Sequence, residues 1–243
     1  MYNNGNNSNN INNSINNIMV KKIKLVLFGN SGAGKTCIVQ RLRYNTFNYN
    51  TDLTIGAAYT IYTVEPNIKI EIWDTAGQER FHSLLPLYAR CAEIIIIVID
   101  IKENIDEQIL KWNKYIQDNE TLFSPNFKLI LIFNKYDLNN DFEIPKDIIN
   151  QTQFGLITLV SAKSGYNIDK LKLHLDVIVK KYIDENAHAS HEHHRNKFNN
   201  SNNDNNSNIE NSSNDTIFGS TFSNMKINFG LSEYKEKMKK CII

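Results

Sequence analysis

The sequence is short of cysteine and of net charge. It contains three cysteines among 243 residues, and its formal net charge is +1. Three scattered cysteines do not make a disulfide framework and indicate a reducing compartment. A charge balance this close to zero gives no general electrostatic attraction to nucleic acid, so we expect no nucleic-acid partner.

Long hydrophobic runs are also missing. The longest aliphatic run, Ile94–Ile101, is interrupted by Asp100 and is too short to span a bilayer. The N-terminus is polar, which argues against a signal peptide, and Tyr2 excludes N-myristoylation. We therefore expect a cytoplasmic protein unless its C-terminus anchors it to a membrane.

Composition divides the chain into three parts. Ten of residues 1–20 are asparagine, and residues 184–243 are again rich in polar side chains. Such segments lack the apolar area that offsets chain entropy, so we expect a disordered N-terminal extension and a disordered C-terminal tail. Residues 21–183 are dense in aliphatic and aromatic side chains, enough for one globular domain.

Short apolar runs alternate with helical patterns in this central part. The sequence predicts strands at 23–28, 57–64, 68–73, 94–100, 128–133 and 157–160. It predicts helices at 35–44, at 104–118 and after Asn167, which suits an N-cap. This alternation indicates an α/β fold in which helices cover both faces of a mostly parallel sheet, with ligands at the carboxyl ends of the strands.

A phosphate-binding loop follows the first predicted strand. Its motif, GxxxxGK[ST], is complete and comprises Gly29, Asn30, Ser31, Gly32, Ala33, Gly34, Lys35 and Thr36. Glycines let backbone amides approach a polyphosphate, Lys35 adds a charge near the β and γ phosphates, and the Thr36 hydroxyl suits Mg²⁺. Kinases, ATPases and GTPases share this motif, so by itself it indicates only a nucleotide.

The second motif, WDTAGQERF, runs from Trp73 to Phe81. Asp74 ends a predicted strand and is placed to hold Mg²⁺ or its waters. A Cβ at Gly77 would obstruct the approach of its amide to a γ-phosphate, and Gln78 can orient an attacking water. The second motif therefore indicates that the protein hydrolyses the nucleotide as well as binding it.

The third and fourth motifs select the base. Asn134, Lys135 and Asp137 form an NKxD segment, in which the Asp137 carboxylate accepts from N1–H and the exocyclic amine of guanine. Adenine lacks that pair of donors, and a buried unpaired carboxylate would reject it. The fourth motif follows the last predicted strand, has backbone amides able to meet guanine O6, and comprises Ser161, Ala162 and Lys163.

The four motifs in this order resemble a small GTPase of the Ras superfamily and, within it, the Rab family. The resemblance covers residues 21–183 and is strongest at Thr54–Tyr59, Trp73–Phe81 and Tyr88–Ala92. The first of these segments is most similar to the endosomal Rab subgroup. The resemblance implies the P-loop NTPase G-domain fold, with a six-stranded and mostly parallel sheet, in a monomeric protein that uses Mg²⁺ and cycles between GDP and GTP.

The resemblance also implies roles for individual residues. Thr54 corresponds to the switch I threonine, which ligates Mg²⁺ through its hydroxyl and contacts the γ-phosphate through its amide. Phe47 corresponds to the aromatic residue that covers the guanine ring. The positions that correspond to the effector surface of Rab proteins are Ile55, Tyr59, Trp73 and Tyr88.

Slow hydrolysis assisted by Lys35 and Gln78 follows from the same resemblance, with an exchange factor, a GTPase-activating protein and effectors as partners. Two other functions compete with it. A GTP-binding scaffold or atypical Rab would hydrolyse negligibly, and the intact Thr54, Asp74 and Gln78 speak against it. An ATP-using P-loop enzyme would have no use for Asp137.

The C-terminal end is basic and carries a single cysteine. Only two residues follow Cys241, which matches neither the paired terminal cysteines nor the CaaX box of Rab proteins. We expect prenylation of Cys241, with nearby lysines adding attraction to anionic lipid. The protein would then cycle between the cytoplasm and the cytosolic face of endomembranes or the plasma membrane.

Overall fold

The chain folds around one six-stranded sheet. A computed structural model describes residues 20–151 and 153–200, with side chains described as far as residue 187. The sheet has the order β2-β3-β1-β4-β5-β6, in which β2 pairs antiparallel with β3 and the other pairs are parallel. The strands are β1 (Lys21–Phe28), β2 (Ala57–Glu65), β3 (Ile68–Thr75), β4 (Ile94–Asp100), β5 (Lys128–Asn134) and β6 (Leu156–Leu159).

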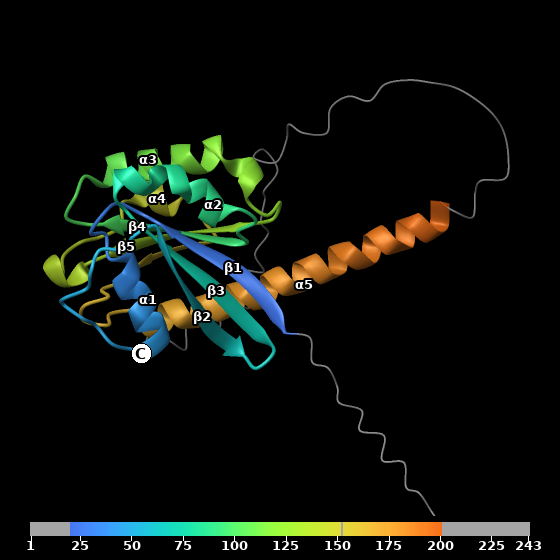
Figure 1. Cartoon of the computed structure of the whole chain (residues 1–243), viewed down its shortest axis with the longest axis horizontal. Coiled ribbons are helices and arrows are strands. Elements are labelled where there is room, and N and C mark those ends of the chain that lie inside the picture. Colours follow the sequence, from blue (N-terminus) through green and yellow to red (C-terminus); the bar gives the residue numbers. More distant parts are fainter. Residues whose placement is uncertain (1–19, 152, 201–243) are drawn as a thin grey trace, which may run out of the picture.

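Helices cover both faces of this sheet (Figure 1). The α-helices are α1 (Lys35–Tyr44), α2 (Leu85–Ala89), α3 (Ile105–Asp118), α4 (Lys146–Ile149) and α5 (Ile168–Asn200). The 3₁₀ helices are η1 (Glu79–Leu84), η2 (Glu120–Leu122) and η3 (Tyr136–Leu138). The α/β fold with a mostly parallel six-stranded sheet is therefore confirmed.

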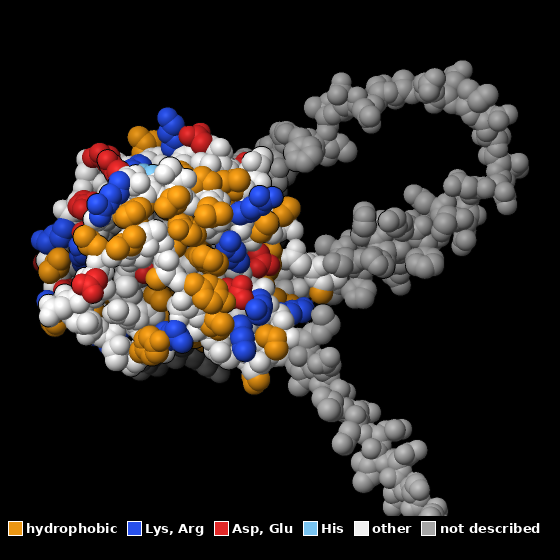
Figure 2. Space-filling model, in the orientation of Figure 1, with side chains coloured by type: hydrophobic (Ala, Val, Ile, Leu, Met, Phe, Trp, Pro, Cys, Tyr) orange, Lys and Arg blue, Asp and Glu red, His pale blue; other side chains and the backbone are white. Residues whose placement is uncertain are grey.

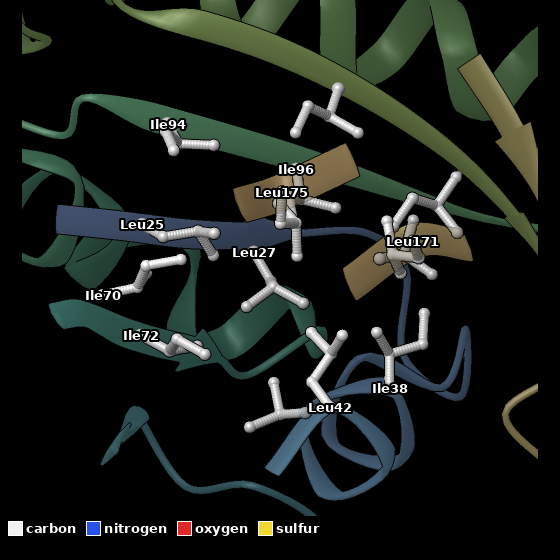
Figure 3. Packing of buried hydrophobic residues seen from close by; sticks show 14 of the residues in the cluster. Leu25, Leu27, Ile38, Leu42, Ile70, Ile72, Ile94, Ile96, Leu171 and Leu175 are labelled. Atoms are coloured by element: carbon white, nitrogen blue, oxygen red, sulfur yellow. The ribbon is translucent and has the colours of Figure 1, made fainter. Parts of the chain in front are cut away.

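Alternate side chains of the central strands build two separate cores. Leu25, Leu27 and Ile96 point to the face covered by α1 and α5, where they meet Ile38 and Leu175 (Figure 3). The residues between them point to the opposite face, which is covered by α2, α3 and α4. Each strand side chain alternates in this way because the period of a strand is two residues.

Strand β4 is buried along its whole length, from Ile94 to Asp100. It lies between β1 and β5 in the middle of the sheet, so both of its faces are covered by helices. A continuous aliphatic run is the expected sequence for such a strand. The strand boundaries predicted above agree with the observed ones to within two residues.

The C-terminal helix is longer than the sequence predicts. We expected a disordered tail from residue 184, but α5 continues to Asn200. Its first part is held by buried side chains such as Tyr182, and Glu185 pairs with Lys128 at 2.7 Å. Neither glycine nor proline occurs between 168 and 200, so elongation of an already packed helix meets no breaker.

The start of α5 agrees with prediction, although the side chain of Asn167 has another role. The Asn167 carbonyl accepts from the Leu171 amide at 2.9 Å, as a capping residue does, while its side-chain amide donates to the Leu159 carbonyl at 2.9 Å. The expected N-terminal extension, residues 1–20, lies outside the described residues except for Val20, and so does the expected lipidation site at Cys241.

Parallel pairing brings the carboxyl ends of β1, β3, β4, β5 and β6 to one edge of the sheet. Each of the four motifs begins at or just after one of these ends, so they meet there. Over the described ranges, none of the helices is both long enough and apolar enough to cross a bilayer.

Two leucines on α5 test the core. Leu175 is 1% exposed and Leu173 is 52% exposed. We expect Leu175→Ala to lower the free energy of unfolding by about 2–5 kcal/mol because it leaves a cavity. The matched Leu173→Ala should change it by less than about 0.5 kcal/mol. Urea unfolding at fixed GDP and Mg²⁺ measures both, and equal losses would contradict this packing.

Candidate functional site

The loop between β1 and α1 is held against the end of β5 by Asn134. The buried Asn134 side chain donates from Nδ2 to the Ala33 carbonyl at 2.9 Å and accepts at Oδ1 from the Ala162 amide at 3.0 Å. Gly34 has φ 91°, and a Cβ there would lie 2.3 Å from Asn134 Nδ2. Only glycine fits this approach, after which α1 begins with its N-terminus beside the loop.

Lys35 is buried in this loop. Its Nζ donates to the carbonyl oxygens of Gly29 at 2.7 Å and Asn30 at 2.9 Å. Burial lowers the pKa of Lys35 to about 8, against the opposing attraction of Asp74. Because burial is costly for the charged ammonium, a bound anion would stabilise it, and the position suits a phosphate.

Three oxygen-bearing side chains converge next to Lys35. Thr36 Oγ1 donates to Asp74 Oδ2 at 2.6 Å and lies 3.0 Å from Thr54 Oγ1. Burial raises the pKa of Asp74, and this effect outweighs the hydrogen bond from Thr36 and the charge of Lys35, which both lower it. In the described part of the chain, its other oxygen, Oδ1, is buried without a hydrogen-bond partner. Hydroxyl and carboxylate oxygens are the ligands that Mg²⁺ takes, so these residues fit that ion.

Gly77 and Gln78 lie against the same loop. A Cβ at Gly77 would come within 2.5 Å of the Asn30 carbonyl oxygen and the Ser31 nitrogen. Gln78 precedes η1, and its Oε1 is buried with no hydrogen-bond partner among the described residues. This oxygen is available to accept a hydrogen bond from a water beside the phosphate-binding loop.

The predicted base-binding residues come together after β5 and β6. Asp137 accepts a hydrogen bond from Ser161 Oγ at 2.5 Å, and its Oδ2 lies 3.8 Å from Lys163 Nζ. The Ala162 amide donates to Asn134, so a contact between that amide and guanine O6 would compete with this bond. Asp137 is thus held by two residues of the segment after β6, one at each carboxylate oxygen.

Phe47 lies in the segment between α1 and β2. Its ring is partly buried against the core on the α1 and α5 face. The ring of Tyr49 meets it edge-on, with centroids 4.9 Å apart and an interplanar angle of 87°.

The aromatic residues of the predicted effector surface form a separate cluster. Trp73 lies between Tyr59 and Tyr88, with ring centroids 5.3 Å and 5.9 Å away respectively. Ile55, from the same predicted surface, is 78% exposed. Hydrophobic side chains are visible across the face on which Figure 1 places β2, β3 and α2 (Figure 2).

The motifs did not identify two residues that support the site. Asp100 ends β4 and forms an ion pair with Lys135 at 2.5 Å, which holds the NKxD segment. Its position after a wholly apolar run was the only signal. Arg41, on α1, donates to the carbonyl oxygens of Ala162 at 2.7 Å and Lys163 at 2.6 Å. Nothing distinguishes it in the sequence from an exposed helix arginine.

Comparison with known proteins agrees with this geometry. The sequence model of the Ras family matches residues 24–212. The ras-related protein Rab-5B of Dictyostelium discoideum is 44% identical over 159 residues, which cover 62% of this chain and 72% of that protein. Rab-12 of Mus musculus and of Homo sapiens is 37% identical over 170 residues, covering 66% of this chain and 68% of each relative.

Both the matched length and the level of identity are sufficient to assign the family. The chain belongs to the Rab family of the Ras superfamily, the small GTPases that hydrolyse GTP and regulate vesicle trafficking.

Proposed function

We propose that the residues brought together at the sheet edge carry the GTPase cycle of this protein. The observation that carries the proposal is the convergence of Thr36, Thr54 and Asp74 beside the buried Lys35. Thr54 belongs to a segment without helix or strand, and its hydroxyl lies 3.0 Å from that of Thr36. A metal and a γ-phosphate at these oxygens would therefore order that segment, and hydrolysis would release it.

The phosphates would be bound by the amides of Gly29–Thr36 and by the Lys35 ammonium. Thr36, Thr54 and Asp74 would hold Mg²⁺, which neutralises charge on the transferring phosphoryl group. The Gly77 amide would meet the γ-phosphate, because its Cα already lies against the loop.

Gln78 would orient the attacking water, and Lys35 would stabilise charge that develops on the phosphoryl oxygens. The unpaired Gln78 Oε1 supports the first of these roles. The loop 29–36 contains no arginine, so fast turnover would require a GTPase-activating protein, which accelerates related enzymes by about 10³–10⁵-fold.

Guanine would be recognised by the Asp137 carboxylate, with Phe47 over the ring and Lys163 beside it. Asn134, Lys135, Ser161 and Ala162 would act by holding these loops in register, as their hydrogen bonds and the Asp100 ion pair suggest. A base without two donors could not make both hydrogen bonds to this carboxylate and would bind more weakly than guanine.

The remaining partners would bind outside the nucleotide site. Effectors would bind the surface formed by Ile55, Tyr59, Trp73 and Tyr88, in which Trp73 packs between the two tyrosines. An exchange factor would restore GTP, and the protein would act as a monomer.

We further propose that prenylated Cys241 and its neighbouring lysines attach the protein reversibly to membranes. One lipid chain alone binds weakly, and a basic segment adds the second attraction that stable attachment needs. The protein would then move between the cytoplasm and the cytosolic face of endomembranes or the plasma membrane.

The base assignment predicts the effect of Asp137→Ala. The variant should lose at least about 100-fold in affinity for GDP, because two hydrogen bonds to a charged acceptor disappear. Asp141→Ala, an exposed acid in the following loop, is the control and should bind as wild type does. Equilibrium competition with a fluorescent GDP measures both; a loss of less than threefold at Asp137 would contradict the assignment.

Replacing Gln78 by leucine should slow hydrolysis by about tenfold or more while GTP binding is retained, because leucine cannot hold a water. Single-turnover hydrolysis, with and without an activating protein, is the appropriate measurement. Gln117→Leu, exposed on α3, serves as the control. Unchanged turnover of the Gln78 variant would overturn the role given to Gln78. Negligible hydrolysis by the wild type, with and without an activating protein, would favour a GTP-binding scaffold.

Cys241→Ser should move the protein from the membrane fraction to the cytosolic fraction of expressing cells and remove an isoprenoid mass from the intact protein. Cys91→Ser, at an exposed cysteine of the G domain, should leave both unchanged. The protein should be tagged at its N-terminus so that Cys241 stays free. Equal partitioning of wild type and Cys241→Ser would rule out anchoring at this residue.

A further inference from the structure

Tyr49 is an exposed side chain in the segment between α1 and β2 whose ring nevertheless contacts other side chains. It is 76% exposed, so packing in the core does not hold it. Its ring meets Phe47 edge-on at 4.9 Å, the geometry in which aromatic pairs attract one another. Phe47 is the residue assigned above to cover the guanine ring, so Tyr49 supports that cover from the outside.

The other partner of Tyr49 comes from the segment after β6. Lys163 Nζ lies 5.5 Å from the centre of the Tyr49 ring, within the range of a cation–π interaction. The same ammonium lies 3.8 Å from Asp137 Oδ2. Tyr49, Lys163 and Asp137 thus form a chain of contacts from the segment before β2 to the carboxylate assigned to the base.

A second bridge joins the same two segments through Arg41. Its guanidinium donates to the Asn45 carbonyl at 2.8 Å and to the Lys163 carbonyl at 2.6 Å. Arg41 therefore fixes the backbone at the start of the segment. The Tyr49 contact lies four residues further along and depends on side chains alone, so it can open while the Arg41 bridge stays closed.

We propose that Tyr49 is a positioning residue that holds Phe47 and Lys163 against the bound guanine nucleotide and slows its release. The inference rests on the proposed function, because it needs guanine between Phe47 and Asp137. With Phe47 over the base, the nucleotide would leave only after Phe47 moves, so contacts that are lost in this step would add to the barrier for release. Tyr49 thereby influences the rate at which GDP dissociates from the protein.

The direct test is the rate at which a fluorescent GDP dissociates in excess unlabelled GDP and Mg²⁺. Tyr49→Ala should release it about five- to tenfold faster, as the loss of one exposed cation–π contact and one aromatic pair implies. Tyr49→Phe keeps the ring and should stay within about twofold of wild type. That rescue separates an effect of the ring on release from a general loss of structure.

Tyr44→Ala provides the matched control. Tyr44 is also an exposed tyrosine with a cation over its ring, Arg43 at 4.8 Å, but it ends α1. It should release GDP at the wild-type rate. If Tyr44→Ala accelerated the release of GDP as much as Tyr49→Ala does, the proposal would be overturned.

The link through Lys163 is tested by a double-mutant cycle. Tyr49→Ala should accelerate release less in a Lys163→Ala background than in the wild type, because the cation–π contact is already gone. An equal acceleration in both backgrounds would overturn the link. If wild type fails to bind GDP, the proposed function is wrong; if it binds and Tyr49→Ala releases at the wild-type rate, only the role of Tyr49 is wrong.

Discussion

Asn134 makes two hydrogen bonds in opposite directions at the end of β5, one to the phosphate-binding loop and one to the segment after β6. Its side chain is buried, so both amide atoms need a partner inside the protein, and both have one. The close approach of Gly34 to the same side chain leaves no room for another residue. Asn134 therefore ties the loop between β1 and α1 to the segment after β6.

The candidate site beside Asn134 contains two buried ionisable groups, Lys35 and Asp74, whose charges the protein alone does not fully stabilise. Burial lowers the pKa of Lys35, whereas burial raises the pKa of Asp74, so each group is held where its charged form is disfavoured. A phosphate beside Lys35 and a divalent cation beside Asp74 would reverse both penalties. Binding of nucleotide and metal would thus complete the electrostatics of the folded domain at the point where the Thr36 and Thr54 hydroxyls meet.

Much of the fold and of the candidate site could be predicted from the amino-acid sequence. The strands were predictable because β4 and its neighbours are buried on both faces and read as short aliphatic runs. The motifs were predictable because each depends on contiguous residues at a strand end. The helical stretch after residue 183 was not, since its polar composition matches a disordered segment while its support comes from Lys128, far away in the chain.

The sequence by itself determined the family, the nucleotide and the α/β fold, because short-range patterns encode a strand, a turn and a helix start. Only the tertiary structure decided that Asp100 supports Lys135, that Arg41 holds the segment before β2 to the segment after β6, and that Tyr49 reaches Lys163. These partners are up to 122 residues apart. No local pattern marks such pairs, since they arise only when parallel strands bring their carboxyl ends to one edge.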